Sequence, residues 1–131
     1  MRMEVAAMTG GAILIIEDNE DLRDEIVDYL CRRGHAASGC KTLAEAHDFC
    51  REHDPAVVVA DIHLPDGSGV TFCRDMADTY PDTRWVLMSG NADLVREGNR
   101  ARTSAFAVID KPIPLRTLDR FIADATQRRS R

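Results

Sequence analysis

The chain has 131 residues, of which 44% are hydrophobic and 30% charged, and its formal net charge is −5. This length and composition are typical of one globular domain and exclude wholesale disorder. The acidic excess disfavours direct contact with nucleic-acid phosphates. The longest apolar runs, at 12–16 and 56–60, are too short to span a bilayer, and no export signal is present. We therefore expect a cytoplasmic protein without a membrane segment.

Short apolar runs predict β-strands buried on both faces at residues 12–16, 56–60, 85–88 and 105–109, with a weaker strand at 35–38. Helical spacing of apolar residues predicts five helices, at about 21–33, 43–52, 70–79, 93–100 and from 114 onward. Thr42 and Glu45 form a capping box that opens the second helix, and Pro114 suits the first position of the last. Five alternations of strand and helix predict a parallel sheet with helices on both faces. We expect this domain to cover residues 11–127, between an N-terminal extension at 1–10 and a tail or start of a linker at 128–131.

Polar residues follow four of the predicted strands, where the carboxyl ends of parallel strands meet at one edge of the sheet. They are Glu17 and Asp18, Asp61, Ser89 and Gly90, and Asp110, Lys111 and Pro112. Three neighbouring carboxylates repel one another unless a cation such as Mg²⁺ joins them. Lys111 and Ser89 suit phosphoryl oxygens, and Gly90 allows close backbone approach. Asp61 is free to act as a carboxylate nucleophile. Carboxylates, a bound cation, a hydroxyl and an ammonium group are what phosphoryl transfer needs, so the residues at this edge of the sheet predict that reaction.

Four ordered blocks of the sequence resemble the signature blocks of response regulator receiver domains, the phosphate-accepting parts of two-component signalling systems. The blocks lie at residues 13–18, 57–67, 88–90 and 110–112, and the resemblance covers about residues 11–125. It implies an α/β fold, a flavodoxin-like doubly wound five-stranded parallel sheet with five helices, (βα)5.

The resemblance also implies a role for individual residues. Asp61 would be phosphorylated, and Mg²⁺ would be held by Glu17, Asp18, Asp61 and the backbone carbonyl of His63. The Ser89 hydroxyl would move toward the phosphoryl group and Lys111 would pair with it. In this family the peptide bond between the lysine and the proline after it is often cis. The corresponding bond here joins Lys111 to Pro112.

The sequence departs from the family where an aromatic residue usually stands, three positions before the lysine. Val108 occupies that position, and Phe106 is the nearest aromatic residue, two positions earlier on the same strand face. Both residues are also ordinary packed strand residues, which is the simpler interpretation. In the family, side chains at the positions of His63 and Asn91 border the path of attacking water. We expect them to tune phosphoryl lifetime here, although an exposed loop histidine needs no such role.

The predicted function is a phosphoacceptor switch, which takes a phosphoryl group from a sensor histidine kinase or a histidine phosphotransfer protein. It would be no turnover enzyme, since it would catalyse only its own phosphorylation and dephosphorylation. A homodimer formed on phosphorylation is a further expectation, while the output partner is left open. The alternative is a phosphate-independent binding module of the same fold. A flavodoxin is disfavoured, because acidic residues follow the first strand where a flavodoxin would bind phosphate. A phosphatase is disfavoured, because His63 stands where a phosphatase would carry a second aspartate.

Four cysteines, at positions 31, 40, 50 and 73, include no C-x-x-C pair and are expected to be reduced thiols. A metal site made of Cys31, His35, Cys50 and His53 is a weaker alternative, because zinc sites usually have two close ligand pairs. The histidines at 35, 47 and 53 are interpreted as surface residues. Charged residues around the fourth and fifth helices, Asp119 among them, mark a candidate interface.

Overall fold

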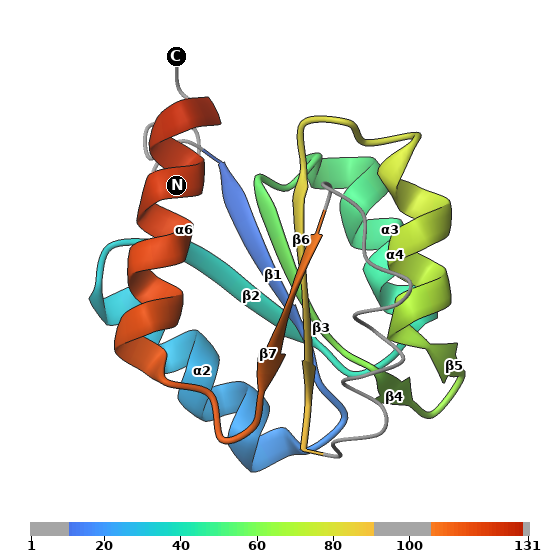
Figure 1. Cartoon of the computed structure of the whole chain (residues 1–131), viewed down its shortest axis with the longest axis horizontal. Coiled ribbons are helices and arrows are strands. Elements are labelled where there is room, and N and C mark those ends of the chain that lie inside the picture. The colour runs from blue at the N-terminus through green and yellow to red at the C-terminus, as the bar shows by residue number, and fades with distance from the viewer. Residues whose placement is uncertain (1–10, 91–105, 130–131) are drawn as a thin grey trace.

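The computed structural model describes residues 11–90 and 106–129, so the helix predicted at 93–100 lies outside the described residues. A parallel five-stranded sheet in the order β2-β1-β3-β6-β7 forms the centre (Figure 1). Its strands are β1 (Ala12–Ile16), β2 (Ala36–Cys40), β3 (Val57–Asp61), β6 (Arg84–Ser89) and β7 (Phe106–Asp110). This order is that of the flavodoxin-like doubly wound fold, as predicted.

Two helical layers cover the sheet, one on each face (Figure 1). The helices described are α2 (Glu20–Arg32), α3 (Leu43–His53), α4 (Gly69–Ala77) and α6 (Leu115–Arg129). Helices α2 and α6 pack on one face of the sheet, and α3 and α4 on the other. No helix within the described ranges is long and apolar enough to cross a membrane.

Strand β1 supplies the centre of both cores. All five of its residues are buried. Ile13 and Ile15 pack in the core beneath α2 and α6, while Leu14 and Ile16 pack in the core beneath α3 and α4. Successive side chains of a strand point to opposite faces, so a continuous apolar run is what a doubly covered strand requires.

The helix beginnings follow from local side chains. Asn19 Oδ1 accepts a hydrogen bond from the Leu22 N–H at 2.9 Å and opens α2. Thr42 Oγ1 accepts one from the Glu45 N–H at 3.2 Å, which confirms the predicted capping box of α3. The last helix begins at Leu115, one residue later than the predicted start at Pro114.

Two features differ from the sequence-based expectation. The weak strand predicted at 35–38 is displaced along the chain and spans Ala36–Cys40. A small antiparallel hairpin, β4 (His63–Leu64) and β5 (Gly67–Ser68), follows β3 and was not predicted. Its strands have two residues each, too few for a pattern of alternation to mark them.

The order of the strands identifies the edge of the sheet at which a ligand is expected to bind. Strand β1 lies between β2 and β3, so the chain leaves β1 toward one side and returns on its other side. Crevices at the carboxyl ends of such strands are where open α/β sheets bind ligands. The residues that follow β1 and end β3 are Glu17, Asp18 and Asp61.

Candidate functional site

Three carboxylates gather at the carboxyl ends of β1 and β3. Glu17, Asp18 and Asp61 each offer a carboxylate oxygen, and these oxygens all lie within 4.8 Å of one another. Glu17 is 1% exposed and Asp61 8% exposed, whereas Asp18 is exposed to solvent. We call this set, together with Lys111, the acidic site.

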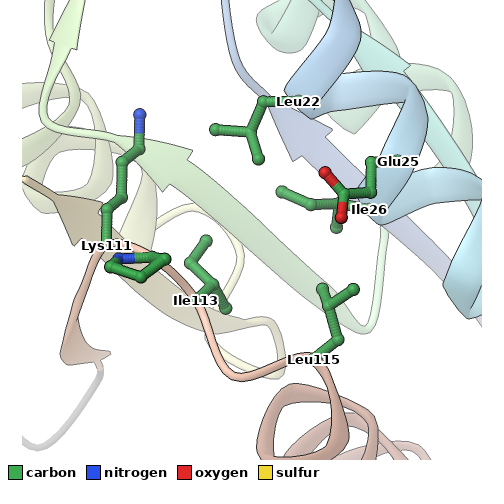
Figure 2. A pocket seen from close by; sticks show the side chains of 7 residues that line it. Leu22, Glu25, Ile26, Lys111, Ile113 and Leu115 are labelled. Carbon is green, nitrogen blue, oxygen red and sulfur yellow. The ribbon is translucent and has the colours of Figure 1, made fainter.

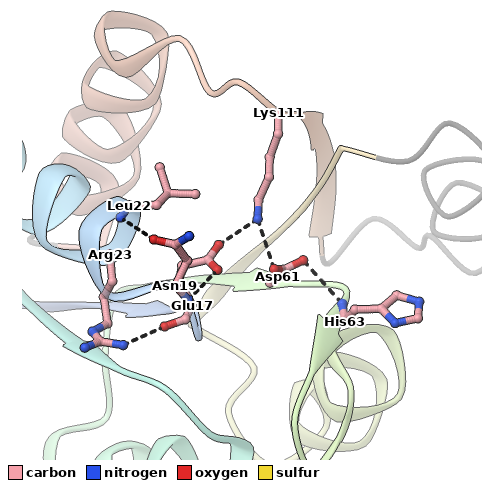
Figure 3. A network of polar contacts seen from close by, with 7 residues as sticks. All are labelled: Glu17, Asn19, Leu22, Arg23, Asp61, His63 and Lys111. Atoms are coloured by element: carbon pink, nitrogen blue, oxygen red, sulfur yellow. Dashed lines mark hydrogen bonds and ion pairs between the residues drawn. The ribbon is translucent and has the colours of Figure 1, made fainter.

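Lys111 extends from the end of β7 and contacts two of the carboxylates (Figure 3). Its Nζ donates hydrogen bonds to Glu17 Oε1 at 2.7 Å and to Asp61 Oδ2 at 3.0 Å. The residue follows β7, and its peptide bond to Pro112 is cis. Three strands far apart in the sequence therefore converge on one cluster.

The electrostatics of the acidic site are unbalanced, because one ammonium group faces three carboxylates. Burial raises the pKa of Glu17, and the hydrogen bond from Lys111 offsets this only in part; the nearby charge of Asp61 raises it further. Burial lowers the pKa of Lys111, but hydrogen bonds to Glu17 and Asp61 outweigh it and raise the pKa above its ordinary value. The direction for Glu17 thus reflects mainly burial, and the direction for Lys111 reflects its two carboxylate partners.

The acidic site is compatible with a hard divalent cation. Its donor set is three carboxylates from two adjacent strands, and Mg²⁺ prefers oxygen ligands of this type. A divalent cation would also neutralise the negative charge that Lys111 leaves unbalanced. The residues present therefore fit the predicted magnesium.

Two further residues hold the loop that carries Glu17 and Asp18, and neither was predicted from the sequence. The backbone N–H of Asn19 donates to Glu17 Oε2 at 3.0 Å, and Arg23 Nη1 donates to the Glu17 carbonyl oxygen at 2.9 Å. Arg23 also lies over Gly39, where an added Cβ would stand 2.8 Å from Arg23 Cγ. Asn19 could have been predicted as a helix cap, because asparagine is a preferred residue directly before a helix. No local pattern in the sequence indicates that Arg23 contacts β2.

His63 stands directly beside the acidic site through its backbone. Its N–H donates to Asp61 Oδ1 at 3.3 Å, and its side chain is exposed (Figure 3). The residue begins β4, and its carbonyl is the fourth ligand that the family resemblance implies. Proximity to Asp61 is thus established for the backbone of His63.

The remaining predicted residues are placed by their strands. Ser89 ends β6 in register with Asp110, Phe106 begins β7, and Asn91 lies outside the described residues. Val108 is half-buried and packs against the core beneath α3 and α4, in agreement with its interpretation as a packed strand residue. A Cβ at Gly90 would lie 3.7 Å from Lys111 Cβ, an ordinary contact, so this glycine is not required by close packing.

An apolar cavity of about 390 Å³ adjoins the acidic site between α2 and the chain after β7. Leu22, Ile26 and Ile113 contribute to its wall, and Glu25 lies at its side (Figure 2). Lys111 also lines the cavity, while its Nζ bonds to the carboxylates outside it. None of the three clustered carboxylates lines this cavity, so it meets the acidic site only at Lys111.

The cysteines form no metal centre within residues 11–90 and 106–129. The group of possible ligands found there is the acidic site, and it includes no cysteine or histidine. All four cysteines are free thiols. Burial raises the pKa of Cys40 to about 12 and that of Cys50 to about 11, which makes both weak nucleophiles.

A histidine and an aspartate that the sequence analysis assigned to the surface are paired in the structure. His35 Nε2 lies 2.7 Å from Asp119 Oδ1, and Arg33 Nε donates to Asp119 Oδ2 at 3.1 Å. The side chains of His35 and Asp119 are only 11% and 15% exposed. The interpretation of His35 as a surface residue was wrong. Its partner, Asp119, is 84 residues away, so no local pattern in the sequence could reveal the pair.

The sheet order and helix layers define a flavodoxin-like α/β domain, with a cluster of three carboxylates at the edge of its sheet. A family model described as the response regulator receiver domain matches residues 13–123. The chain belongs to the response regulator receiver domain family.

Curated relatives with similar sequences include two sensor proteins. The chain is 31% identical over 116 residues to the sensor kinase CckA of Brucella abortus, and 29% identical over 127 residues to the sensor protein TorS of Escherichia coli. These matches cover 85% and 95% of the chain but only 12% and 14% of the relatives. Other relatives are DNA-binding regulators, such as NtrC of Azospirillum brasilense at 23% identity over 111 residues, which covers 85% of the chain and 23% of the relative.

Solved receiver domains share the fold. The receiver domain of an HD domain-containing protein from Pseudomonas fluorescens superposes with a TM-score of 0.81 at 18% identity, covering 93% of this chain and 90% of that one. The beryllofluoride-activated receiver domain dimer of NtrC4 superposes with a TM-score of 0.75 at 24% identity, covering 90% and 98% of the two chains. At these identities the likeness concerns the fold.

Proposed function

We propose that this receiver domain accepts a phosphoryl group on Asp61 in a Mg²⁺-dependent reaction. The observation that carries the proposal is the convergence of Asp61, two further carboxylates and the Lys111 ammonium at one sheet edge. The donor would be a sensor histidine kinase or a histidine phosphotransfer protein. Membership of the receiver family supports such a donor, because its relatives include sensor kinases and response regulators.

In the proposed reaction, a carboxylate oxygen of Asp61 forms a bond to phosphorus as the bond from phosphorus to the donor's histidine nitrogen breaks. The nitrogen keeps the electron pair and is protonated from solvent. Asp61 is 8% exposed, and its two carboxylate oxygens accept hydrogen bonds from the His63 N–H and from Lys111 Nζ. Later attack of water on the same phosphorus would release phosphate and regenerate the carboxylate. The chain would thus catalyse only its own phosphorylation and dephosphorylation.

Four groups would hold the magnesium: the carboxylates of Glu17, Asp18 and Asp61, and the backbone carbonyl of His63. When bound, Mg²⁺ supplies positive charge that offsets the developing charge on the phosphoryl oxygens. Lys111, already 3.0 Å from Asp61 Oδ2, would pair with one phosphoryl oxygen. Ser89 would donate its hydroxyl to another.

Four residues would set the lifetime of the phosphoryl group or the response of the surface to it: His63, Asn91, Phe106 and Val108. Joint replacement of His63 and Asn91 should change the dephosphorylation rate if they border the path of water. An unchanged rate would reject that role. Val108 in place of the usual aromatic residue should leave phosphorylation itself intact.

The proposed domain is residues 11–127, and the family match over 13–123 supports these limits. We also propose a cytoplasmic location, since a reducing compartment keeps four thiols free. The altered surface would be read by an output partner, with a phosphorylation-dependent homodimer as one form of output. The net charge of −5 disfavours direct nucleic-acid binding by this chain.

Intact-protein mass spectrometry after incubation with acetyl phosphate and Mg²⁺ tests the proposal. The expected result is a gain of one phosphoryl mass that disappears without Mg²⁺ and in Asp61→Asn. A chain that gains no phosphoryl mass and also fails to bind beryllofluoride would instead be a phosphate-independent binding module.

A further inference from the structure

The first turn of α3 needs more hydrogen-bond acceptors than its own sequence supplies. Thr42 Oγ1 accepts from the Glu45 N–H at 3.2 Å, and Glu45 Oε1 accepts from the Lys41 N–H at 3.0 Å. This local capping box leaves the N–H groups of Leu43 and Ala44 without partners inside the helix. A second cap comes from a distant part of the chain.

Asp66 provides that second cap with both of its carboxylate oxygens. Oδ1 accepts from the Leu43 N–H at 2.9 Å, and Oδ2 accepts from the Ala44 N–H at 3.1 Å. The hydrogen bond from Leu43, supported by that from Ala44, lowers the pKa of Asp66 below its ordinary value. Hydrogen bonds to a charged acceptor are about twice as strong as neutral ones.

Asp66 lies in the turn of the β4–β5 hairpin, directly before Gly67. His63 pairs with Ser68, and Leu64 with Gly67. Gly67 has a φ of +151°, and an added Cβ there would stand 3.1 Å from Leu43 Cδ1. The tip of the hairpin therefore packs tightly against the first residue of α3 as well as bonding to it.

The base of the same hairpin is fixed to the acidic site. The His63 N–H donates to Asp61 Oδ1 at 3.3 Å, and the Gly69 N–H donates to the Ile62 carbonyl oxygen at 2.8 Å. Gly69 has no room for a side chain, because a Cβ would collide with the Asp61 carbonyl oxygen. A continuous chain of contacts thus runs from Asp61 through the hairpin to α3.

We propose that Asp66 is a positioning residue of the acidic site. Its carboxylate anchors the tip of the hairpin to α3 and thereby fixes the backbone of His63 beside Asp61. Without this anchor the hairpin loses its hydrogen bonds to α3. It keeps the bonds at its base and its link to α4, where Ser68 Oγ accepts from the Val70 N–H at 3.1 Å. The kinetic consequence rests on the proposed function of Asp61, whereas the anchor itself does not.

The chain offers a matched control for this inference. Asp66→Ala and Thr42→Ala each remove a cap from the first turn of α3, but only Asp66 belongs to the hairpin. We expect Asp66→Ala to change the rate of phosphorylation by acetyl phosphate, or the phosphoryl lifetime, by about fivefold. A misplacement of about 1 Å at a reacting centre can cost roughly a hundredfold, and the shift expected here is smaller. Thr42→Ala should keep both within about twofold. Asp66→Asn, which retains one acceptor oxygen, should fall between wild type and Asp66→Ala.

Amide hydrogen exchange in the unphosphorylated chain tests the anchor independently. Asp66→Ala should speed exchange at His63 as well as at Leu43 and Ala44, while Thr42→Ala should speed it only at Glu45. Unchanged exchange at His63 in Asp66→Ala, or equal kinetic effects of the two variants, would overturn the inference. If wild type takes up no phosphoryl group, the proposed function fails, and the exchange result still decides whether the anchor exists.

Discussion

Two charged clusters join distant parts of this chain, and they differ in their balance of charge. At the acidic site one lysine faces three carboxylates. At the carboxyl end of α2, Asp119 of α6 faces Arg33 and His35, at 3.1 and 2.7 Å. We call this second cluster the α6 clasp.

The pKa directions separate the two clusters. Burial raises the pKa of Glu17, and the single lysine does not restore it. Burial also raises the pKa of Asp119, but hydrogen bonds from His35 and Arg33 outweigh it and hold the pKa below its ordinary value. A carboxylate whose hydrogen-bond partners lower its pKa stabilises the fold, whereas a surplus of carboxylates is suited to bind a cation.

The largest expected effect comes from removing the lysine of the acidic site. Lys111→Met should lower the free energy of unfolding by about 3 kcal/mol in metal-free buffer, because Glu17 then remains buried without its partner. Mg²⁺ should restore part of the loss. Denaturant unfolding with and without Mg²⁺ measures both, and Lys41→Met, at an exposed position, is the control. Equal losses in the two variants would contradict the account.

A smaller loss is expected from the α6 clasp. Asp119→Asn should lower the free energy of unfolding by about 1.5 kcal/mol, since it removes a half-buried carboxylate that is bonded to both Arg33 and His35. Mg²⁺ should not reduce this loss, in contrast to Lys111→Met. Recovery of the Asp119→Asn variant by Mg²⁺ would mean that the two clusters do not act separately.

Removal of a carboxylate from the acidic site should have the opposite sign. Asp61→Asn relieves repulsion by Glu17 and Asp18 but loses the attraction to Lys111. The balance should raise the free energy of unfolding in metal-free buffer by about 0.5 kcal/mol. Thermal unfolding in the presence of a chelator measures this change. A clear loss of stability would show that the carboxylates are already balanced.

The smallest effect is expected in the pH dependence of the clasp. Because the pKa of Asp119 is lower in the folded chain, its ionised form stabilises the fold above the ordinary value of 3.8. This contribution is lost as the pH falls below that value and through the lowered pKa. Asp119→Asn should therefore lose less stability than wild type between neutral pH and about pH 3. Parallel pH profiles of the two chains would exclude this contribution.

Much of the fold could be predicted from the sequence, because its signals are local. The fully buried strand β1 reads as a continuous apolar run, and Thr42 with Glu45 marks the start of α3 within four residues. Asp61 and Lys111 could be placed at one edge because parallel strands present their carboxyl ends together. The acidic site thus follows from strand alternation and the residues that end each strand.

The contacts that could not be predicted join residues far apart in the sequence, for which no local sequence pattern indicates a partner. Asp119 meets His35 across 84 residues, and Asp66 caps a helix that begins 23 residues earlier. The β4–β5 hairpin has strands of two residues, below the length at which alternation is detectable. Only the packed chain brings such partners together.

Calorimetric titration of Mg²⁺ into the wild-type chain, Asp61→Asn and Asp119→Asn tests the central claim most directly. The account predicts binding by wild type and by Asp119→Asn with similar affinity, and binding weaker by at least about tenfold in Asp61→Asn, which lacks one of three clustered carboxylates. Equal affinity of wild type and Asp61→Asn, or the absence of binding by wild type, would contradict the claim that the unbalanced carboxylates form the cation site.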